Sequence, residues 1–193
     1  MSWKEHIQQT NLKICKSIGV LARIRHHAPK NILVNIYNAF IQPHINYGII
    51  NWGGSYKTTL DPLRKSMKRA VRLITFQSRS THSRPLFNDL KLLCFNDCYK
   101  LECAKFMHDI KNKNLDDNFC SLFLLTKNRH DILTRQATSD LFVQPATRTN
   151  IKHQSIINSG VKIWNSIPFD IRQFKNKHTF SKHYKAWLLK NSA

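Results

Sequence analysis

The sequence at residues 61–74 is DPLRKSMKRAVRLI. At 100° per residue, its apolar side chains fall on one face of a helix and its basic side chains fall on the other. The apolar positions are Leu63, Met67, Ala70, Val71 and Ile74, and the basic positions include Lys65, Lys68, Arg69 and Arg72. Proline is favoured in the first turn of a helix, so Asp61-Pro62 predicts the helix start. The stretch therefore predicts a basic amphipathic helix.

The charge on this helix is one-sided. A solvated surface helix usually pairs Glu with Lys at i,i+4, but residues 62–74 contain no acid. A helix that lies along a phosphate backbone needs only cations on one face and apolar anchoring on the other. We therefore favour nucleic-acid contact over plain solvation. The candidate nucleic-acid-binding residues are Arg64, Lys65, Lys68, Arg69 and Arg72.

The whole chain is strongly basic. Its 193 residues include 31 Lys and Arg against 11 Asp and Glu, which gives a formal charge of +20. A self-repelling cation of this size favours a polyanionic partner, either nucleic acid or an anionic membrane surface. At 41% apolar residues the chain can still build a packed core. No stretch is apolar enough to span a bilayer, so we expect no transmembrane segment. Of the two polyanions we favour nucleic acid, and we expect no membrane partner.

The cysteines and the N-terminal residues indicate a compartment. Five cysteines occur without a secretory leader, because Lys4 and Glu5 interrupt the start and no apolar segment follows. We therefore expect an intracellular protein in a reducing compartment, either the nucleus or the cytoplasm.

The hydrophobic periodicity predicts a mainly α fold. A first helix is expected from Trp3 to Arg25, and a second begins at Pro29 and is interrupted at Pro43. Further helices are expected at residues 85–93, 96–111, 155–164 and 179–189. Leu141–Val143 are typical of a strand, which predicts a smaller α+β C-terminal region with one candidate β-hairpin near residues 140–152.

No catalytic site has a convincing local signature. The Asp116-Asp117 pair could hold magnesium, but the polar residues before it favour a helix N-cap. Cys94, Cys98 and Cys103, with His108, point to different sides of one predicted helix, so buried thiols are favoured over zinc. Asp97 with Asp109-Ile110-Lys111 resembles a nuclease core only faintly, because such cores normally lie on strands. We therefore expect no catalytic residue, metal or cofactor in this chain.

Several short motifs occur in an order that resembles a known family. The chain resembles the C-terminal part of the reverse transcriptase of non-LTR retrotransposons, most closely the jockey-like elements of animals. The similarity covers nearly the whole chain, and its specificity comes from shared order and spacing. The motifs are Trp3-Lys4-Glu5-His6-Ile7, Tyr47-Gly48, Asn51-Trp52-Gly53, the helix at 67–74, His82, Pro85-Leu86-Phe87, Leu90–Leu93, His130, Thr134-Arg135, Gly160 and Trp164-Asn165-Ser166-Ile167-Pro168.

This resemblance implies a position within the polymerase. Residues 1–93 would form a thumb-like helical bundle that packs against the template-primer duplex, and residues 94–193 would form a C-terminal region without a firm role. The palm with its catalytic aspartates, the fingers and the endonuclease are missing, so magnesium is expected only in the missing palm.

The chain alone is therefore predicted to be inactive, as a fragment of an RNA-directed DNA polymerase. Its expected partners are an RNA/DNA duplex and the fingers and palm of the parent polymerase. Two alternatives stay open. One is a free-standing metal-dependent nuclease or transferase with an unrecognised site, and the other is a degenerate relic without function.

Overall fold

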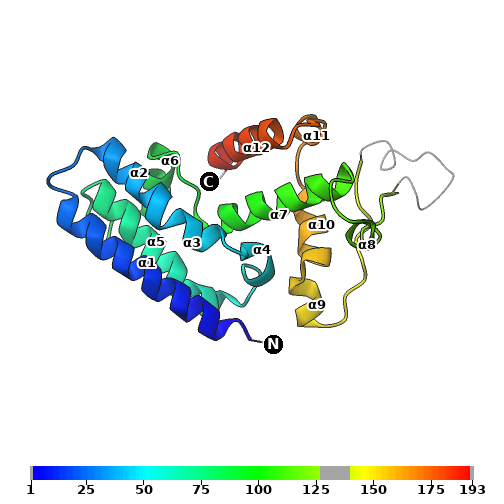
Figure 1. Cartoon of the computed structure of the whole chain (residues 1–193), viewed down its shortest axis with the longest axis horizontal. Helices are drawn as coiled ribbons and strands as arrows, with labels where there is room; N and C mark the ends of the chain where they lie inside the picture. The colour runs from blue at the N-terminus through cyan, green and yellow to red at the C-terminus, as the bar shows by residue number, and fades with distance from the viewer. Residues whose placement is uncertain (1, 127–139, 192–193) are drawn as a thin grey trace. The chain divides into compact units, whose positions relative to one another are not determined.

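The computed structural model describes residues 2–126 and 140–191, and it confirms the mainly α prediction (Figure 1). His130 and Thr134-Arg135 of the family resemblance lie outside the described residues. The helices are α1 (Lys4–Ile24), α2 (Lys30–Phe40), α3 (Gln42–Asn46), α4 (Ile49–Trp52), α5 (Lys57–Ile74), α6 (Ser83–Asp89), α7 (Phe95–Lys111), α8 (Asp117–Cys120), α9 (Asn150–Gln154), α10 (Ile156–Asn165), α11 (Phe169–Arg172) and α12 (Lys177–Asn191). Within the described ranges, none of these helices combines the length and the apolar character needed to cross a membrane.

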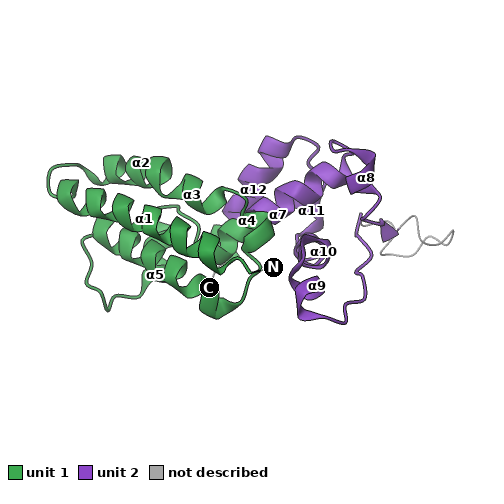
Figure 2. Ribbon diagram, turned by 60° about the horizontal axis from the view of Figure 1, so that its bottom comes forward, with its two compact units in different colours: residues 1–99, 189–193 green, residues 100–188 purple. Residues whose placement is uncertain are grey.

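The chain divides into two compact units (Figure 2). Unit 1 comprises Met1–Tyr99 with Leu189–Ala193, and unit 2 comprises Lys100–Leu188. The regions 1–93 and 94–193 were predicted from the family resemblance and its roles, so this geometric division does not test them.

Unit 1 is built around the pairing of α1 with α5, which lie side by side (Figures 1 and 2). Both helices bury an apolar stripe, because their apolar residues recur every three or four positions. Ile7, Ile14, Ile18 and Leu21 come from α1, and Leu60, Leu63, Met67, Ala70, Val71 and Ile74 come from α5. A partly buried polar contact also links the two helices, since Ser66 Oγ donates to Asn11 Oδ1 at 2.7 Å.

Helix α5 begins earlier than its sequence predicts. Its first residue is Lys57, and Pro62 therefore lies inside the helix instead of opening it. The reason is Leu60, which is 1% exposed and lies three residues before Leu63, so extending the helix adds it to the buried stripe. Thr58 and Pro62 are both exposed, so the carbonyl that loses its helical N–H partner lies at the surface.

The segment between α2 and α5 turns tightly against the start of α7. The predicted interruption at Pro43 is confirmed, because α2 ends at Phe40 and α3 carries Pro43 in its first turn. A Cβ at Gly53 would lie 2.5 Å from Tyr99 Cδ2 and 2.6 Å from the Ile49 carbonyl oxygen. Glycine is therefore required there by close packing.

Unit 2 has a core of aromatic side chains. The Trp164 ring lies 6.0 Å from Phe142 and 5.7 Å from Phe180, and His108 stacks on Phe180 at 4.7 Å. His108 is fully buried, and its Nε2 lies within hydrogen-bond distance, 2.8 Å, of the Phe174 carbonyl oxygen. This histidine is therefore a core residue of unit 2, with backbone and ring contacts in place of any solvent.

The predicted β-hairpin near residues 140–152 is not found in the part of the chain that the structure describes. Phe142 makes one isolated antiparallel bridge, with Leu125. Its backbone N–H and carbonyl are taken by the Asn165 side chain at 3.1 and 2.9 Å, so no second strand is needed there. Residues Asn150–Gln154 form α9 instead, because the Thr149 side chain accepts the Lys152 N–H as an N-cap. The prediction of an α+β C-terminal region was therefore not supported.

Candidate nucleic-acid interface

The solvent-facing side of α5 carries the predicted basic residues. Three of them, Lys65, Lys68 and Arg69, are exposed and occupy positions i, i+3 and i+4 of the helix. Their side chains make no hydrogen bond or ion pair with any residue in 2–126 or 140–191. Neighbours at this spacing lie about 5–6 Å apart at Cβ, so the three cations form one continuous patch. We call Lys65, Lys68 and Arg69 the α5 patch.

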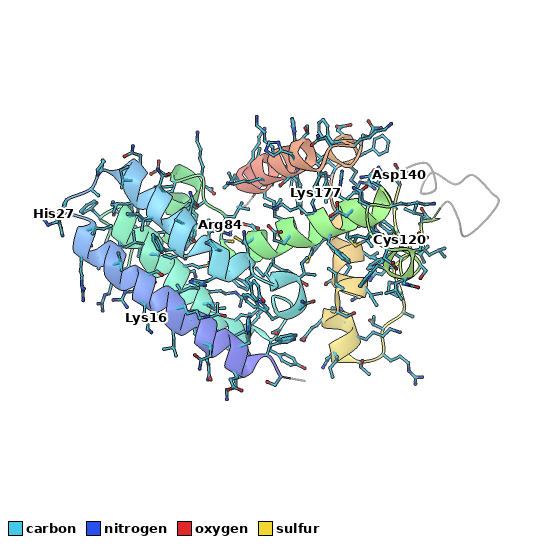
Figure 3. The ribbon with its side chains drawn as sticks, in the orientation of Figure 1. Lys16, His27, Arg84, Cys120, Asp140 and Lys177 are labelled. Atoms are coloured by element: carbon cyan, nitrogen blue, oxygen red, sulfur yellow. The ribbon has the colours of Figure 1, made fainter. Side chains whose placement is uncertain are left out.

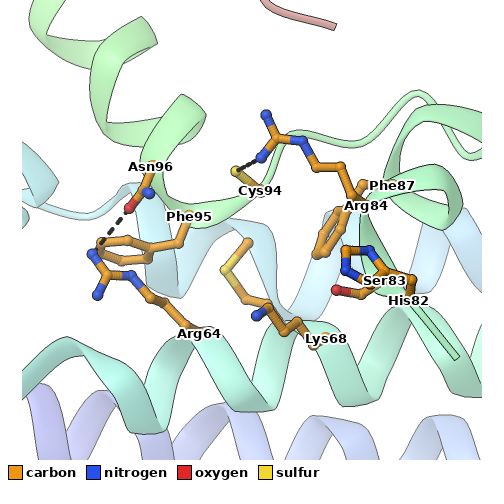
Figure 4. A pocket seen from close by; sticks show the side chains of 10 residues that line it. Arg64, Lys68, His82, Ser83, Arg84, Phe87, Cys94, Phe95 and Asn96 are labelled. Carbon is orange, nitrogen blue, oxygen red and sulfur yellow. Dashed lines mark hydrogen bonds between the residues drawn. The ribbon is translucent and has the colours of Figure 1, made fainter. Parts of the chain in front are cut away.

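The other two predicted residues are held by neighbours within unit 1. The Arg64 side chain is only 22% exposed, and its guanidinium lies 3.3 Å from Asp61 Oδ1. The guanidinium donates to Asn96 Oδ1 at 3.0 Å (Figure 4). It also lies 5.5 Å from the centre of the Phe95 ring. Arg72 donates from Nε to the Thr81 carbonyl at 2.9 Å, which ties the loop after α5 to the helix. These two arginines lie beside the α5 patch, and their side chains are held by contacts within unit 1.

A pocket of about 330 Å³ adjoins the α5 patch and is lined by α5, α6, the residue before α6 and the start of α7 (Figure 4). Lys68 lies on its wall with Arg64, Arg84 and His82. The apolar lining side chains are almost fully buried, since Phe87 and Phe95 are each 3% exposed. The pocket offers a ligand both apolar contact and the hydrogen-bond donors of Arg64, Lys68 and Arg84.

A cysteine at the pocket is held as a neutral thiol. Cys94 Sγ donates to Asp97 Oδ2 at 3.0 Å and accepts from Arg84 Nη1 at 3.2 Å. Burial, followed by the hydrogen bond to Asp97, raises the pKa of Cys94 above its ordinary value of 9.0. A protonated thiol is a poor nucleophile and a poor metal ligand, so Cys94 has a structural role here.

The other residues considered for chemistry have structural partners. Asp116 Oδ1 accepts the Asn118 N–H at 2.8 Å and caps α8, which confirms the N-cap interpretation. Asp109 pairs with Lys177, which Figure 3 labels on α12. Cys98 and Cys103 are both buried, which agrees with their interpretation as buried thiols. Within residues 2–126 and 140–191, no three His, Cys, Asp or Glu side chains lie close enough together to hold a metal ion.

A second exposed basic surface lies on α12, in a region to which the sequence had assigned no role. His178, Lys182 and Lys185 are exposed and recur at intervals of four and three residues. The signal was present in the sequence, because Asp170 is the last acid and six Lys or Arg follow it. It was less apparent than the signal in α5, since large aromatic residues interrupt the basic ones.

Comparison with protein-family models, with curated proteins and with solved structures finds no match to this chain. The function is therefore argued from the side chains of the two units themselves.

Proposed function

We propose that the chain is a nucleic-acid-binding fragment, the thumb and C-terminal part of a jockey-like non-LTR reverse transcriptase. In this role it contacts the template-primer duplex through the sugar-phosphate backbone, and the polymerase chemistry belongs to the palm. The order of the short motifs supports the family assignment. The α5 patch supports the mode of binding.

The observation that carries the proposal is the state of the α5 patch. Three cations that are already paired with carboxylates would gain little from a phosphate, because each would first have to give up its partner. Lys65, Lys68 and Arg69 have no such partner in the described residues. Each phosphate they neutralise releases a condensed counterion, which is the main source of sequence-independent affinity. A polymerase thumb requires that kind of binding, because it must follow every template.

The buried side of α5 favours nucleic acid over a membrane as the partner. A basic amphipathic helix binds an anionic bilayer by inserting its apolar face between the lipids. In α5 that face is occupied, since Leu63, Met67 and Val71 are each at most 1% exposed in the core of unit 1. The helix can therefore offer a partner charge but no apolar side, which suits a phosphate backbone.

The proposal is tested by fluorescence anisotropy with an RNA–DNA hybrid over a range of salt concentrations. For the wild-type chain, the logarithm of the association constant is expected to fall steeply with the logarithm of salt. In the Lys65→Gln/Lys68→Gln/Arg69→Gln variant, the slope is expected to shrink by about 0.9 per lost phosphate contact, or about 2.7 for three. Unrelated hybrid sequences are expected to behave alike.

The matched control is Lys4→Gln/Lys91→Gln/Lys152→Gln, which removes the same charge from exposed positions outside the patch. If the salt slope of the control shrank as much as that of the patch variant, binding would depend only on net charge, and the proposal would be contradicted. Magnesium-dependent turnover of DNA, RNA or hybrid that is lost in Asp116→Ala or Asp109→Ala would instead support a free-standing enzyme.

A further inference from the structure

The outer face of α12 carries a stripe of basic side chains without acids. On a helical wheel, His178, Lys182 and Lys185 fall within about 60° of one another. The large side chains of the opposite face, Phe180 and Tyr184, are 0% and 1% exposed and belong to the core of unit 2. We call His178, Lys182 and Lys185 the α12 stripe.

The two lysines of the stripe are exposed. Lys182 and Lys185 make no side-chain hydrogen bond or ion pair with any residue in 2–126 or 140–191. Lys177, at the start of the same helix, does have a partner, since it pairs with Asp109. The stripe thus has the two properties of the α5 patch, namely exposed cations on one side of a helix and an apolar face that is already buried.

We propose that the α12 stripe is a second nucleic-acid-binding surface, which contacts the sugar-phosphate backbone. This inference goes beyond the function proposed above, because it assigns a binding role to unit 2. It rests on the charges of α12 and needs neither the family resemblance nor the α5 patch.

A phosphate backbone fits this surface better than the other common polyanion, an anionic membrane. Membrane-bound helices insert Trp, Phe or Leu side chains between the lipids. In α12 the aromatic side chains pack inward, and the partly exposed Trp187 stacks on Tyr184 at 5.8 Å between ring centres. The stripe offers the charges of Lys182 and Lys185 with no exposed apolar side chain, and phosphates spaced along a strand can be bound by cations alone.

Two backbone-binding surfaces in one chain have a consequence that can be measured. When one surface is bound, the linked second surface meets the same nucleic acid at high effective concentration, so a long duplex binds more tightly than either surface alone allows. A duplex too short to reach both surfaces engages one surface at a time. The affinity gain from lengthening the duplex should therefore require both the α5 patch and the α12 stripe.

The test compares Lys182→Gln/Lys185→Gln with Lys4→Gln/Lys152→Gln, which removes the same charge from exposed positions elsewhere. With a hybrid duplex of several turns, the stripe variant is expected to lose about 1.8 from the salt slope, at about 0.9 for each of two contacts. The control is expected to keep the wild-type slope. Circular dichroism and thermal unfolding of both variants check that these surface changes leave the fold intact.

The outcomes separate this inference from the function proposed above, because the α5 patch variant is measured in parallel. A wild-type slope in the stripe variant, with loss only in the patch variant, overturns the inference and leaves the proposed function standing. Loss only in the stripe variant supports the inference and contradicts the role of α5. Vesicles of phosphatidylcholine and phosphatidylserine are the third arm: stripe-dependent binding to vesicles, with duplex binding unchanged, would overturn the inference in favour of a membrane.

Discussion

Tyr37 buries a polar group in the core of unit 1. Its side chain is fully buried on α2, and its hydroxyl has no hydrogen-bond partner among the described residues. Burial raises the pKa of Tyr37 well above its ordinary value of 10.0, and the neighbouring Cys98 and Cys94 add to the effect. The ring fills the core, but the hydroxyl loses its hydration without a protein partner in return.

Replacing this hydroxyl should therefore stabilise the protein. Removing a buried unsatisfied group recovers its desolvation penalty, so Tyr37→Phe is expected to raise the free energy of unfolding by roughly 1 kcal/mol at neutral pH. The pH dependence has a definite sign. The raised folded-state pKa gives a contribution that is fully present below pH 10.0 and is lost as the pH rises from there towards the folded-state value. Only the wild type loses it, so the advantage of Tyr37→Phe should grow above pH 10.0.

Urea unfolding of the wild type and Tyr37→Phe at neutral and alkaline pH measures both effects. A variant that is less stable than the wild type at neutral pH would mean that the hydroxyl has a partner worth more than its desolvation cost.

At the scale of single elements, α5 shows what periodicity can and cannot predict. Its buried and basic faces followed from the spacing of residues 63–74, and they were confirmed because a helical stripe depends only on that spacing. The predicted start of α5 was wrong by four residues. The helix extends back to Lys57 because the extension buries Leu60 in the core, despite the helix-breaking tendency of Pro62. The α12 stripe was not predicted from the sequence, although α12 also has an exposed basic side and a buried apolar side.

Contacts between distant segments account for what the sequence could not indicate. The hairpin near residues 140–152 was predicted from local β propensity, but the backbone of Phe142 is satisfied by Asn165, 23 positions away. Likewise, Arg64 and Lys68 were indistinguishable in sequence. Asn96 and Phe95 approach Arg64 only because the start of α7 packs beside α5. Which cation is free and which is held depends on tertiary packing, and no local pattern encodes it.

The start of α5 can be tested directly with Pro62→Ala. If the helix begins at Lys57, alanine restores the missing N–H to the Thr58 carbonyl and removes an interior proline, which costs a helix about 3 kcal/mol. Alanine also makes the unfolded chain more flexible than proline does, which lowers the free energy of unfolding by up to about 1 kcal/mol. Pro62→Ala should therefore raise the free energy of unfolding by roughly 1–2 kcal/mol, measured by thermal or urea unfolding. If α5 instead began at Pro62, proline would be favourable there and the variant would be less stable.

At the scale of the whole molecule, the charge of +20 acts on folding and on binding in opposite directions. Self-repulsion among these cations raises the free energy of the compact state, and added salt screens it, with a Debye length of about 10 Å at 0.1 M. Salt should therefore stabilise the free chain. The same salt competes with the protein for phosphates and should weaken binding to a duplex.

Salt should therefore have opposite effects on the stability of the free chain and on its affinity for nucleic acid. Between about 50 and 200 mM KCl, the free energy of unfolding without nucleic acid is expected to rise, while affinity for an RNA–DNA hybrid falls by several powers of ten for six or more phosphate contacts. Bound duplex stabilises the folded chain by mass action, so its addition should raise the unfolding temperature more at low salt than at high salt. Urea unfolding, anisotropy and thermal unfolding at both salt concentrations measure the three quantities. A free chain that loses stability as salt is added would contradict the account, because the attractive ion pairs would then outweigh the repulsion on which the proposed polyanion partner rests.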